Sequence, residues 1–253
     1  MRHLLHDMNP SVKFIVVAVS MLALAFFFNP WTPLLFWIGL LIMQLIFSQM
    51  NWKLWALFML PFSLGAFGYL WTTVVFSAVT GGTVIWSFAG IEVTDVQWNQ
   101  ALSLAFRVMA FSALSLAFAL TTDPVRFIMS LMQQLKLSPK LAYGVMVGYQ
   151  FLPVLKDEFV QIQQAHRLRG FVAEVQWWQR LLALRRLLIP MLAGAVRKAE
   201  RAAFAMEARG FTGEARSVFY CPVPVGRIDF MMSAVFLALL VVSCLGGLWL
   251  SGK

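Results

Sequence analysis

Charged residues are scarce in this chain of 253 residues. Asp, Glu, Lys and Arg make up 12% of it, whereas hydrophobic residues make up 60% and the mean hydropathy is +0.77. Soluble domains contain roughly 25% charged and 45–50% apolar residues, so this composition excludes a soluble globular protein. It indicates an integral membrane protein.

Cysteine, histidine and acidic residues are also few. The two cysteines, Cys221 and Cys244, fall in a polar and an apolar segment, so we expect no disulfide framework. The three histidines lack metal-ligand spacing, and the 11 acidic residues are dispersed. Residues 247–253 spell Gly-x-x-x-x-Gly-Lys, but a phosphate loop needs a preceding strand and a following Ser or Thr. We expect no metal site, no bound cofactor and no catalytic residue on this chain.

Long apolar runs predict an all-α fold with about five transmembrane helices. The runs 54–79, 101–120 and 230–250 are long enough to cross a bilayer, which takes about 20 helical residues. Two shorter runs, 14–28 and 34–47, flank a tight turn, and we expect them to form a thin helical hairpin. No small-residue cleavage site follows the first run, so we expect a retained anchor rather than a signal peptide.

The basic residues are segregated along the chain. Most of the 20 Lys and Arg residues lie between residues 122 and 227, whereas the segments 29–33 and 80–100 contain neither. Because positively charged segments tend to stay in the cytoplasm, we predict that the N-terminus lies inside and the C-terminus outside. The net charge of +9 then reflects topology in a lipid bilayer, and no nucleic-acid partner is expected.

The basic stretch is expected to consist of long cytoplasmic and interfacial helices. Asp-Pro at 123–124 and Ser-Pro at 138–139 have the residues that begin helices, and Pro153 is expected to bend or break the second helix. Residues 171–189 are amphipathic and predict a helix at the membrane interface, which Pro190 is expected to end. The predicted parts are residues 1–121 (the first four spans), 122–226 (the cytoplasmic helices) and 227–253 (the last span).

A short motif occurs twice in this stretch. Residues 165–171 read AHRLRGF and residues 205–211 read AMEARGF. Glycine is common just past a helix end, because it tolerates a left-handed backbone, and the helix dipole favours an arginine in the last turn. Such a guanidinium can project beyond the helix and bind a carboxylate through two donors. Two matched tips predict two equivalent docking points, for two like subunits on one side of the membrane.

These motifs resemble those of the transmembrane T component of energy-coupling factor (ECF) transporters, the EcfT/CbiQ-type family. The resemblance covers nearly the whole chain. MNPSVK (8–13) is similar to the family's Asp-Pro-x-x-Lys motif, with Asn9 where Asp is usual, and TTDPVRFIMSL (121–131) is similar to its Thr-Thr-x-Pro stretch. The segment 149–170 resembles the family's run into its first X-Arg-X motif, with Gln150 where Arg is common.

The resemblance implies a transport function without catalysis on this chain. Proteins of this family join one substrate-binding membrane S component to two ABC ATPase subunits, which bind the ATP. They import vitamins or transition-metal ions across the inner (cytoplasmic) membrane of prokaryotes. Each X-Arg-X motif is implied to dock into a groove on one ATPase. The implied ATPase-coupling residues are Leu168, Arg169, Gly170, Ala208, Arg209 and Gly210.

Two other functions stay open at this point. A conventional ABC-importer permease would form its own substrate pathway, and a membrane-embedded enzyme would need His, Ser or acidic residues facing one site. Few polar residues lie within the predicted spans, and this argues against both. Arg107 is charged and lies within the fourth span, where charge is costly. We expect its side chain to snorkel or to have a local structural partner.

Overall fold

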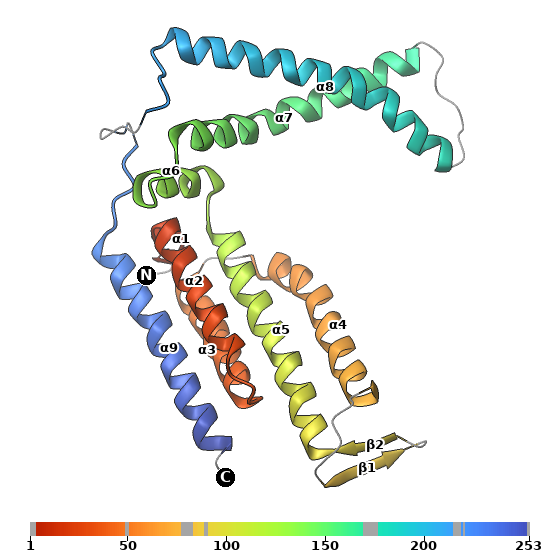
Figure 1. The fold of residues 1–253 in the computed structure, drawn as a ribbon, viewed down its shortest axis with the longest axis vertical. Helices are drawn as coiled ribbons and strands as arrows, with labels where there is room; N and C mark the ends of the chain where they lie inside the picture. The colour runs from red at the N-terminus through yellow and green to blue at the C-terminus, as the bar shows by residue number, and fades with distance from the viewer. Residues whose placement is uncertain are drawn as a thin grey trace. The chain divides into compact units, whose positions relative to one another are not determined.

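The structure is a computed structural model, which describes residues 4–48, 51–76, 83–88, 91–168, 177–214, 219 and 221–251. Within these residues lie nine helices and one two-stranded antiparallel sheet (Figure 1). The helices are α1 (Leu4–Asp7), α2 (Pro10–Ala25), α3 (Trp31–Phe47), α4 (Trp52–Phe76), α5 (Asp95–Thr121), α6 (Pro124–Gln134), α7 (Pro139–Leu168), α8 (Trp177–Ala208) and α9 (Arg227–Ser251). The strands are β1 (Val84–Phe88) and β2 (Ile91–Thr94).

The chain forms two compact units. The first comprises Met1–Ser130 and Val223–Lys253, and the second comprises Leu131–Pro222. The chain therefore leaves the first unit once, within α6, and returns to it shortly before α9.

The first unit is built around a five-helix bundle of α2, α3, α4, α5 and α9. Helix α5 packs against α2, α3 and α4, and α9 packs against α2 and α3. Figure 1 shows successive helices of the bundle running in alternate directions. Large apolar side chains fill the interior at exposures of 0–1%, namely those of Leu24, Phe36, Leu40, Leu114, Met232 and Phe236. Many others face outward, as expected of helices that lie in lipid.

Among the described residues, three helices are long and apolar enough to cross a membrane. These are α4, α5 and α9, with 25, 27 and 25 residues. Helices α2 and α3 are apolar but shorter, with 16 and 17 residues, or about 24–26 Å at 1.5 Å per residue. The two helices pack mainly against α5 and α9 rather than against each other, so the thin hairpin stays a prediction. The prediction of an all-α membrane protein is confirmed.

One prediction for the long helices is wrong. Pro190 does not end the amphipathic segment, because α8 continues through it for 32 residues in all. Pro153 does not break its helix, since α7 runs from Pro139 to Leu168, and a bend at this residue stays a prediction. A proline inside a helix removes one backbone hydrogen bond and costs about 3 kcal/mol. Leu- and Ala-rich flanking turns, which favour the helix, maintain it here. Residues 171–176 of the predicted interfacial helix lie outside the described residues.

Within the second unit, α7 and α8 pack at a small residue. A Cβ at Gly194 would lie 2.5 Å from Glu158 Oε1, so a larger residue here would require the Glu158 side chain to move. Glu158 also forms an ion pair with Lys198 at 2.6 Å. The sequence suggested Gly144 and Gly148 as a close-packing pair. A Cβ added at either glycine would have no described atom within 4 Å, so neither lies at a close helix contact within the described residues.

Candidate functional site

The second copy of the repeated motif forms a glycine-capped helix end. Gly210 follows α8 with φ +78°, in the left-handed region. The Gly210 N–H donates to Glu207 O at 2.9 Å, and the Phe211 N–H donates to Met206 O at 3.1 Å. This pair of bonds is the Schellman arrangement, in which two orphan carbonyls of the last turn are satisfied. The predicted helix cap is therefore present at this tip.

The cap places Arg209 at the end of α8 with its side chain exposed. The guanidinium forms no hydrogen bond or ion pair with any described residue. The chain just after it is fixed, because the Phe211 ring packs edge-on against Tyr143 of α7 with centroids 5.4 Å apart. Ala208, the last residue of α8, is exposed as well. A rigid turn thus presents five unused donors on a planar group.

The first copy of the motif is described only in part. Helix α7 ends at Leu168, whose side chain is 90% exposed. Arg169 and Gly170 lie outside the described residues. The roles assigned to Leu168, Arg169 and Gly170 therefore stay predictions. An apolar side chain this exposed at a helix end would gain from burial in a partner.

A buried polar network surrounds Asn9 at the start of α2. Asn9 Oδ1 accepts a hydrogen bond from the Ser11 N–H at 3.1 Å and one from Ser130 Oγ at 2.6 Å. Ser130 Oγ also lies 2.6 Å from Ser11 Oγ. All three residues are at most 2% exposed. The side chain of Asn9 therefore caps α2 and ties it to α6.

The same asparagine binds the segment that leads into α9. Its N–H donates to Asp229 Oδ1 at 2.6 Å, and its Nδ2 donates to Val223 O at 3.1 Å. The other oxygen of Asp229 accepts a hydrogen bond from the Gly226 N–H at 2.7 Å, and Asp229 is 4% exposed. This carboxylate is stabilised because it lies in the first turn of a helix and has charge-assisted partners.

Asn9 thus contacts both points where the chain crosses between the units. Ser130 is the last residue of the first unit before the crossing, and Val223 is the first residue after the return. Each crossing point is hydrogen-bonded to Asn9 at the start of α2, through a buried bond at Ser130 and a partly buried one at Val223, and breaking a buried bond is costly. The bundle therefore holds both ends of the second unit's chain at one place.

Lys13 caps the C-terminal end of helix α5. Its Nζ donates to Thr121 O at 3.2 Å, to Thr121 Oγ1 at 3.1 Å and to Thr122 Oγ1 at 3.4 Å. These residues end α5, where unpaired carbonyls carry partial negative charge. The fold thereby joins the two segments, 8–13 and 121–131, that resembled family motifs in the sequence.

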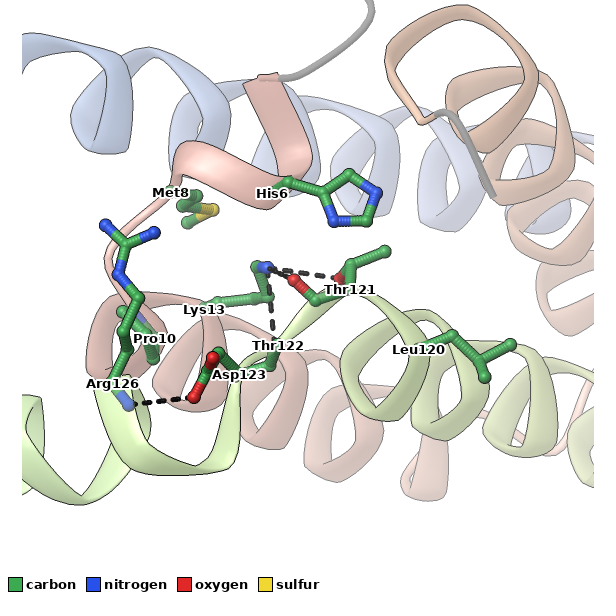
Figure 2. Close-up of a pocket in the computed structure, with 9 residues that line it drawn as sticks. All are labelled: His6, Met8, Pro10, Lys13, Leu120, Thr121, Thr122, Asp123 and Arg126. Atoms are coloured by element: carbon green, nitrogen blue, oxygen red, sulfur yellow. Dashed lines mark hydrogen bonds between the residues drawn. The ribbon is translucent and has the colours of Figure 1, made fainter. Parts of the chain in front are cut away.

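A cavity of about 280 Å³ lies beside Lys13. Figure 2 shows the Lys13 side chain between those of His6 and Arg126, with its hydrogen bonds to the two threonines. The lining residues are His6, Met8, Pro10, Lys13, Leu120, Thr121, Thr122, Asp123 and Arg126. The cavity is mainly polar and carries more basic than acidic groups.

Arg107 has local structural partners, which was one of the two expectations for it. The guanidinium donates to the carbonyl of Phe27 and lies over the ring of Phe28, 5.3 Å from its centroid. The arginine therefore holds the turn between α2 and α3. In the described part of the chain, no group of three His, Cys, Asp or Glu side chains could hold a metal ion.

Sequence reasoning missed Ser130, Asp229 and the cavity. Asp229 carries one available signal, because it is the one acidic residue of α9 and lies in the first turn of that apolar helix. Ser130 carries none, since a serine within an amphipathic helix is ordinary. Both partners lie more than 100 residues from Asn9 along the chain.

Comparison with known proteins reveals relatives along most of the chain. Residues 1–220 match the family CbiQ, described as a cobalt transport protein. The energy-coupling factor transporter transmembrane protein EcfT of Streptococcus thermophilus is 27% identical over 224 residues, which cover 83% of this chain and 81% of the relative. EcfT of Limosilactobacillus fermentum is 27% identical over 245 residues, which cover 91% of this chain and 88% of the relative. EcfT of Listeria innocua is 25% identical over 221 residues, or 83% and 81%.

Proposed function

The chain belongs to the CbiQ family of cobalt transport proteins, and we propose that it is the transmembrane coupling subunit of an ECF-type ABC importer. It is a multi-pass membrane protein, and its relatives are transmembrane components of ECF transporters. In the proposed assembly it joins two ATPase subunits, which bind the ATP, to one S component, which binds a vitamin or a transition-metal ion. The chain itself would carry no catalytic residue.

The observation that carries this proposal is the Arg209 tip. Its guanidinium is exposed on a turn that is fixed by the glycine cap and by the Phe211–Tyr143 contact. The planar guanidinium can bind a carboxylate with two parallel hydrogen bonds, and the fixed turn limits the backbone entropy that is lost when it does so. The related sequence at 165–171, which shares Arg169 and Gly170 with this motif, is proposed to dock the second ATPase.

The network around Asn9 supports the transmission step. The two chain crossings are covalent routes between the tips and the bundle, and both are hydrogen-bonded to Asn9 at Ser130 and Val223. We propose that this network is the fixed point about which the second unit moves. Small displacements of packed elements can be amplified when their attachment points do not yield.

Replacing both arginines tests the docking role. We expect Arg169→Ala with Arg209→Ala to release co-purifying ATPases, or to uncouple ATP hydrolysis from uptake, with normal membrane insertion. Loss of one member of a hydrogen-bonded interfacial charge pair costs about 2–5 kcal/mol. Arg197→Ala with Arg201→Ala, two exposed arginines within α8, is the matched control and should change neither property. Parental ATPase binding and uptake in the Arg169/Arg209 variant would refute the proposal.

The same purification distinguishes the alternatives. An ECF-type coupling subunit co-purifies with ATPases and a small membrane protein, whereas a conventional permease co-purifies with ATPases alone and binds substrate itself. A membrane-embedded enzyme would need neither partner. Mass spectrometry of the complex, with both neighbouring subunits co-expressed, identifies which of these three compositions is present.

A further inference from the structure

We propose that the cavity beside Lys13 binds the phosphate group of an anionic phospholipid. The proposal is independent of the coupling role. Nitrogen groups that carry or can carry positive charge come from three separate elements, as His6 on α1, Lys13 on α2 and Arg126 on α6. The hydroxyl groups of Thr121 and Thr122 line the same space. This set of donors is the chemistry that phosphate oxygens require.

The positive charge in this cavity lacks a compensating anion. Lys13 is 2% exposed, yet its three acceptors are a carbonyl and two hydroxyl groups. No carboxylate of the described residues lies within ion-pair distance of Lys13 or Arg126. Arg126 repels Lys13, while Asp7 and Asp229 attract it only from a longer range. Because a buried, unpaired charge is costly, an anion placed between Lys13 and Arg126 would be bound favourably.

The one carboxylate that lines the cavity is already engaged. Asp123 Oδ1 accepts hydrogen bonds from the Val125 N–H at 2.7 Å and from the Arg126 N–H at 3.2 Å, and so caps α6. Figure 2 shows this carboxylate turned toward the backbone of Arg126. The positive end of the α6 dipole balances its charge in part. Asp123 therefore leaves the charge of Lys13 available to a ligand.

The position of the cavity favours a lipid over free phosphate. It lies where α2 begins and α5 ends, and lipid phosphates lie at such span ends. An aromatic cluster lies next to its basic residues in the sequence, because Phe14 follows Lys13 and Phe127 follows Arg126 along the chain. Their rings are 5.6 Å apart, and Phe118 of α5 packs against both at 5.8 and 5.3 Å. Phe14 is 43% exposed, so an acyl chain can reach it.

Basic pockets between spans commonly hold anionic lipid headgroups, and lipid titration tests this one. The protein is purified from membranes in a neutral detergent and titrated with phosphatidylglycerol, with phosphatidylcholine, or with inorganic phosphate. The thermal unfolding midpoint reports stabilisation, and native mass spectrometry counts retained lipids. We expect phosphatidylglycerol to raise the midpoint and to remain bound, while phosphatidylcholine and inorganic phosphate have little effect.

The variant Arg126→Gln assigns the effect to the cavity. This side chain is exposed and forms no hydrogen bond with the described residues, so its loss should leave the fold intact. We expect about fivefold weaker binding of phosphatidylglycerol, the factor that one basic residue near an anionic surface implies. Arg227→Gln, an exposed arginine that begins α9 outside the cavity, is the matched control and should bind as the parent does.

Three results would overturn the proposal, the first two of which concern lipid binding itself. The first is equal stabilisation by phosphatidylglycerol and phosphatidylcholine, which would mean that the headgroup charge is not recognised. The second is unchanged phosphatidylglycerol binding by Arg126→Gln, which would place the lipid elsewhere. Full stabilisation by inorganic phosphate alone, lost in Arg126→Gln, would overturn the lipid assignment and leave a site for the free anion.

Discussion

The backbone N–H of Asn9 donates a 2.6 Å hydrogen bond to Oδ1 of Asp229, although 220 positions separate the two residues. Both residues are buried, at 2% and 4% exposure. The bond fixes the start of α2 to the first turn of α9. Because Asn9 also binds Ser130 and Val223, this one residue joins the start of α2 to α6 and to the segment that leads into α9.

Asp229→Asn is expected to lower the free energy of unfolding by about 1–3 kcal/mol. The carboxylate accepts from the N–H groups of Asn9 and Gly226 through separate oxygens, at 2.6 and 2.7 Å. An amide has only one oxygen, so one buried N–H loses its acceptor. Thermal or denaturant unfolding in mild detergent measures the change. Asp157→Asn, an exposed site on α7, should shift stability by less than about 0.5 kcal/mol. Equal stability of the two variants would contradict the role of Asp229.

Asn9→Asp introduces the residue that is usual in the family, and we still expect it to destabilise this protein by about 1–3 kcal/mol. Asn9 Nδ2 donates to the carbonyls of Val223 and Pro224 at 3.1 and 3.4 Å. A carboxylate would turn an acceptor toward these carbonyls and place a second negative charge beside Asp229. Asn99→Asp, in the exposed first turn of α5, is the control. An unchanged unfolding midpoint for Asn9→Asp would show that the two carbonyls have other donors available.

Local features of the fold were predictable from the sequence, and the reason is that their signals are local. The apolar runs predicted α4, α5 and α9, because lipid demands a continuous apolar helix. The predicted cap Asp123 does accept from the Val125 and Arg126 N–H groups. The effect of proline was overestimated at Pro190, where α8 continues despite one missing backbone hydrogen bond.

The candidate site was predictable only in part. The Arg209 tip follows from a glycine at a helix end, which local geometry explains. The Asn9 network joins residues 119 to 220 positions apart, and no periodicity or local propensity signals such a pair. The hairpin of β1 and β2 was predicted as a plain connecting segment. Short strands outside a larger sheet have weak sequence signals. Here β2 leads directly into the capping box Thr94–Gln97, which begins α5.

Arg107→Met is expected to lower stability by about 1.5–3 kcal/mol, the range for hydrogen bonds that involve charged groups. The guanidinium donates to the carbonyl of Phe27 and lies 5.3 Å from the centroid of the Phe28 ring. Methionine preserves the apolar length of the side chain and removes these contacts. Unfolding in detergent measures the loss of stability. The stability of Arg107→Lys should lie between that of the parent and that of Arg107→Met, because lysine retains one donor group. A Met variant as stable as the parent would mean that Arg107 only snorkels.

The orientation of the chain can be tested with single cysteines. Thr83→Cys and Thr212→Cys are exposed positions, each placed in a chain whose Cys221 and Cys244 are replaced by serine. Because the basic residues are concentrated in the second unit, we expect an impermeant maleimide to label Thr83→Cys in intact cells. Thr212→Cys should react only after permeabilisation. The reverse pattern would invert the predicted topology.

Gly210→Ala is expected to weaken ATPase binding while Arg209 remains in place. Gly210 has φ +78°, a left-handed backbone that costs a residue with a Cβ about 1–2 kcal/mol. No described atom lies within 4 Å of a built Cβ, so the effect is conformational rather than steric. The strained turn would relax and the Schellman bonds from Gly210 and Phe211 would weaken, so the guanidinium would no longer be presented in a fixed direction.

Co-purification of the ATPases, at equal membrane abundance of the variants, measures this effect. Gly144→Ala is the matched control, because its Cβ also meets no described atom within 4 Å but its backbone is helical. Alanine is favoured over glycine by about 1 kcal/mol inside a helix, so this variant should bind ATPases as the parent does and be no less stable. If Gly210→Ala retained parental ATPase binding, the charge of Arg209 alone would be sufficient for docking, and the left-handed cap would be only a helix end.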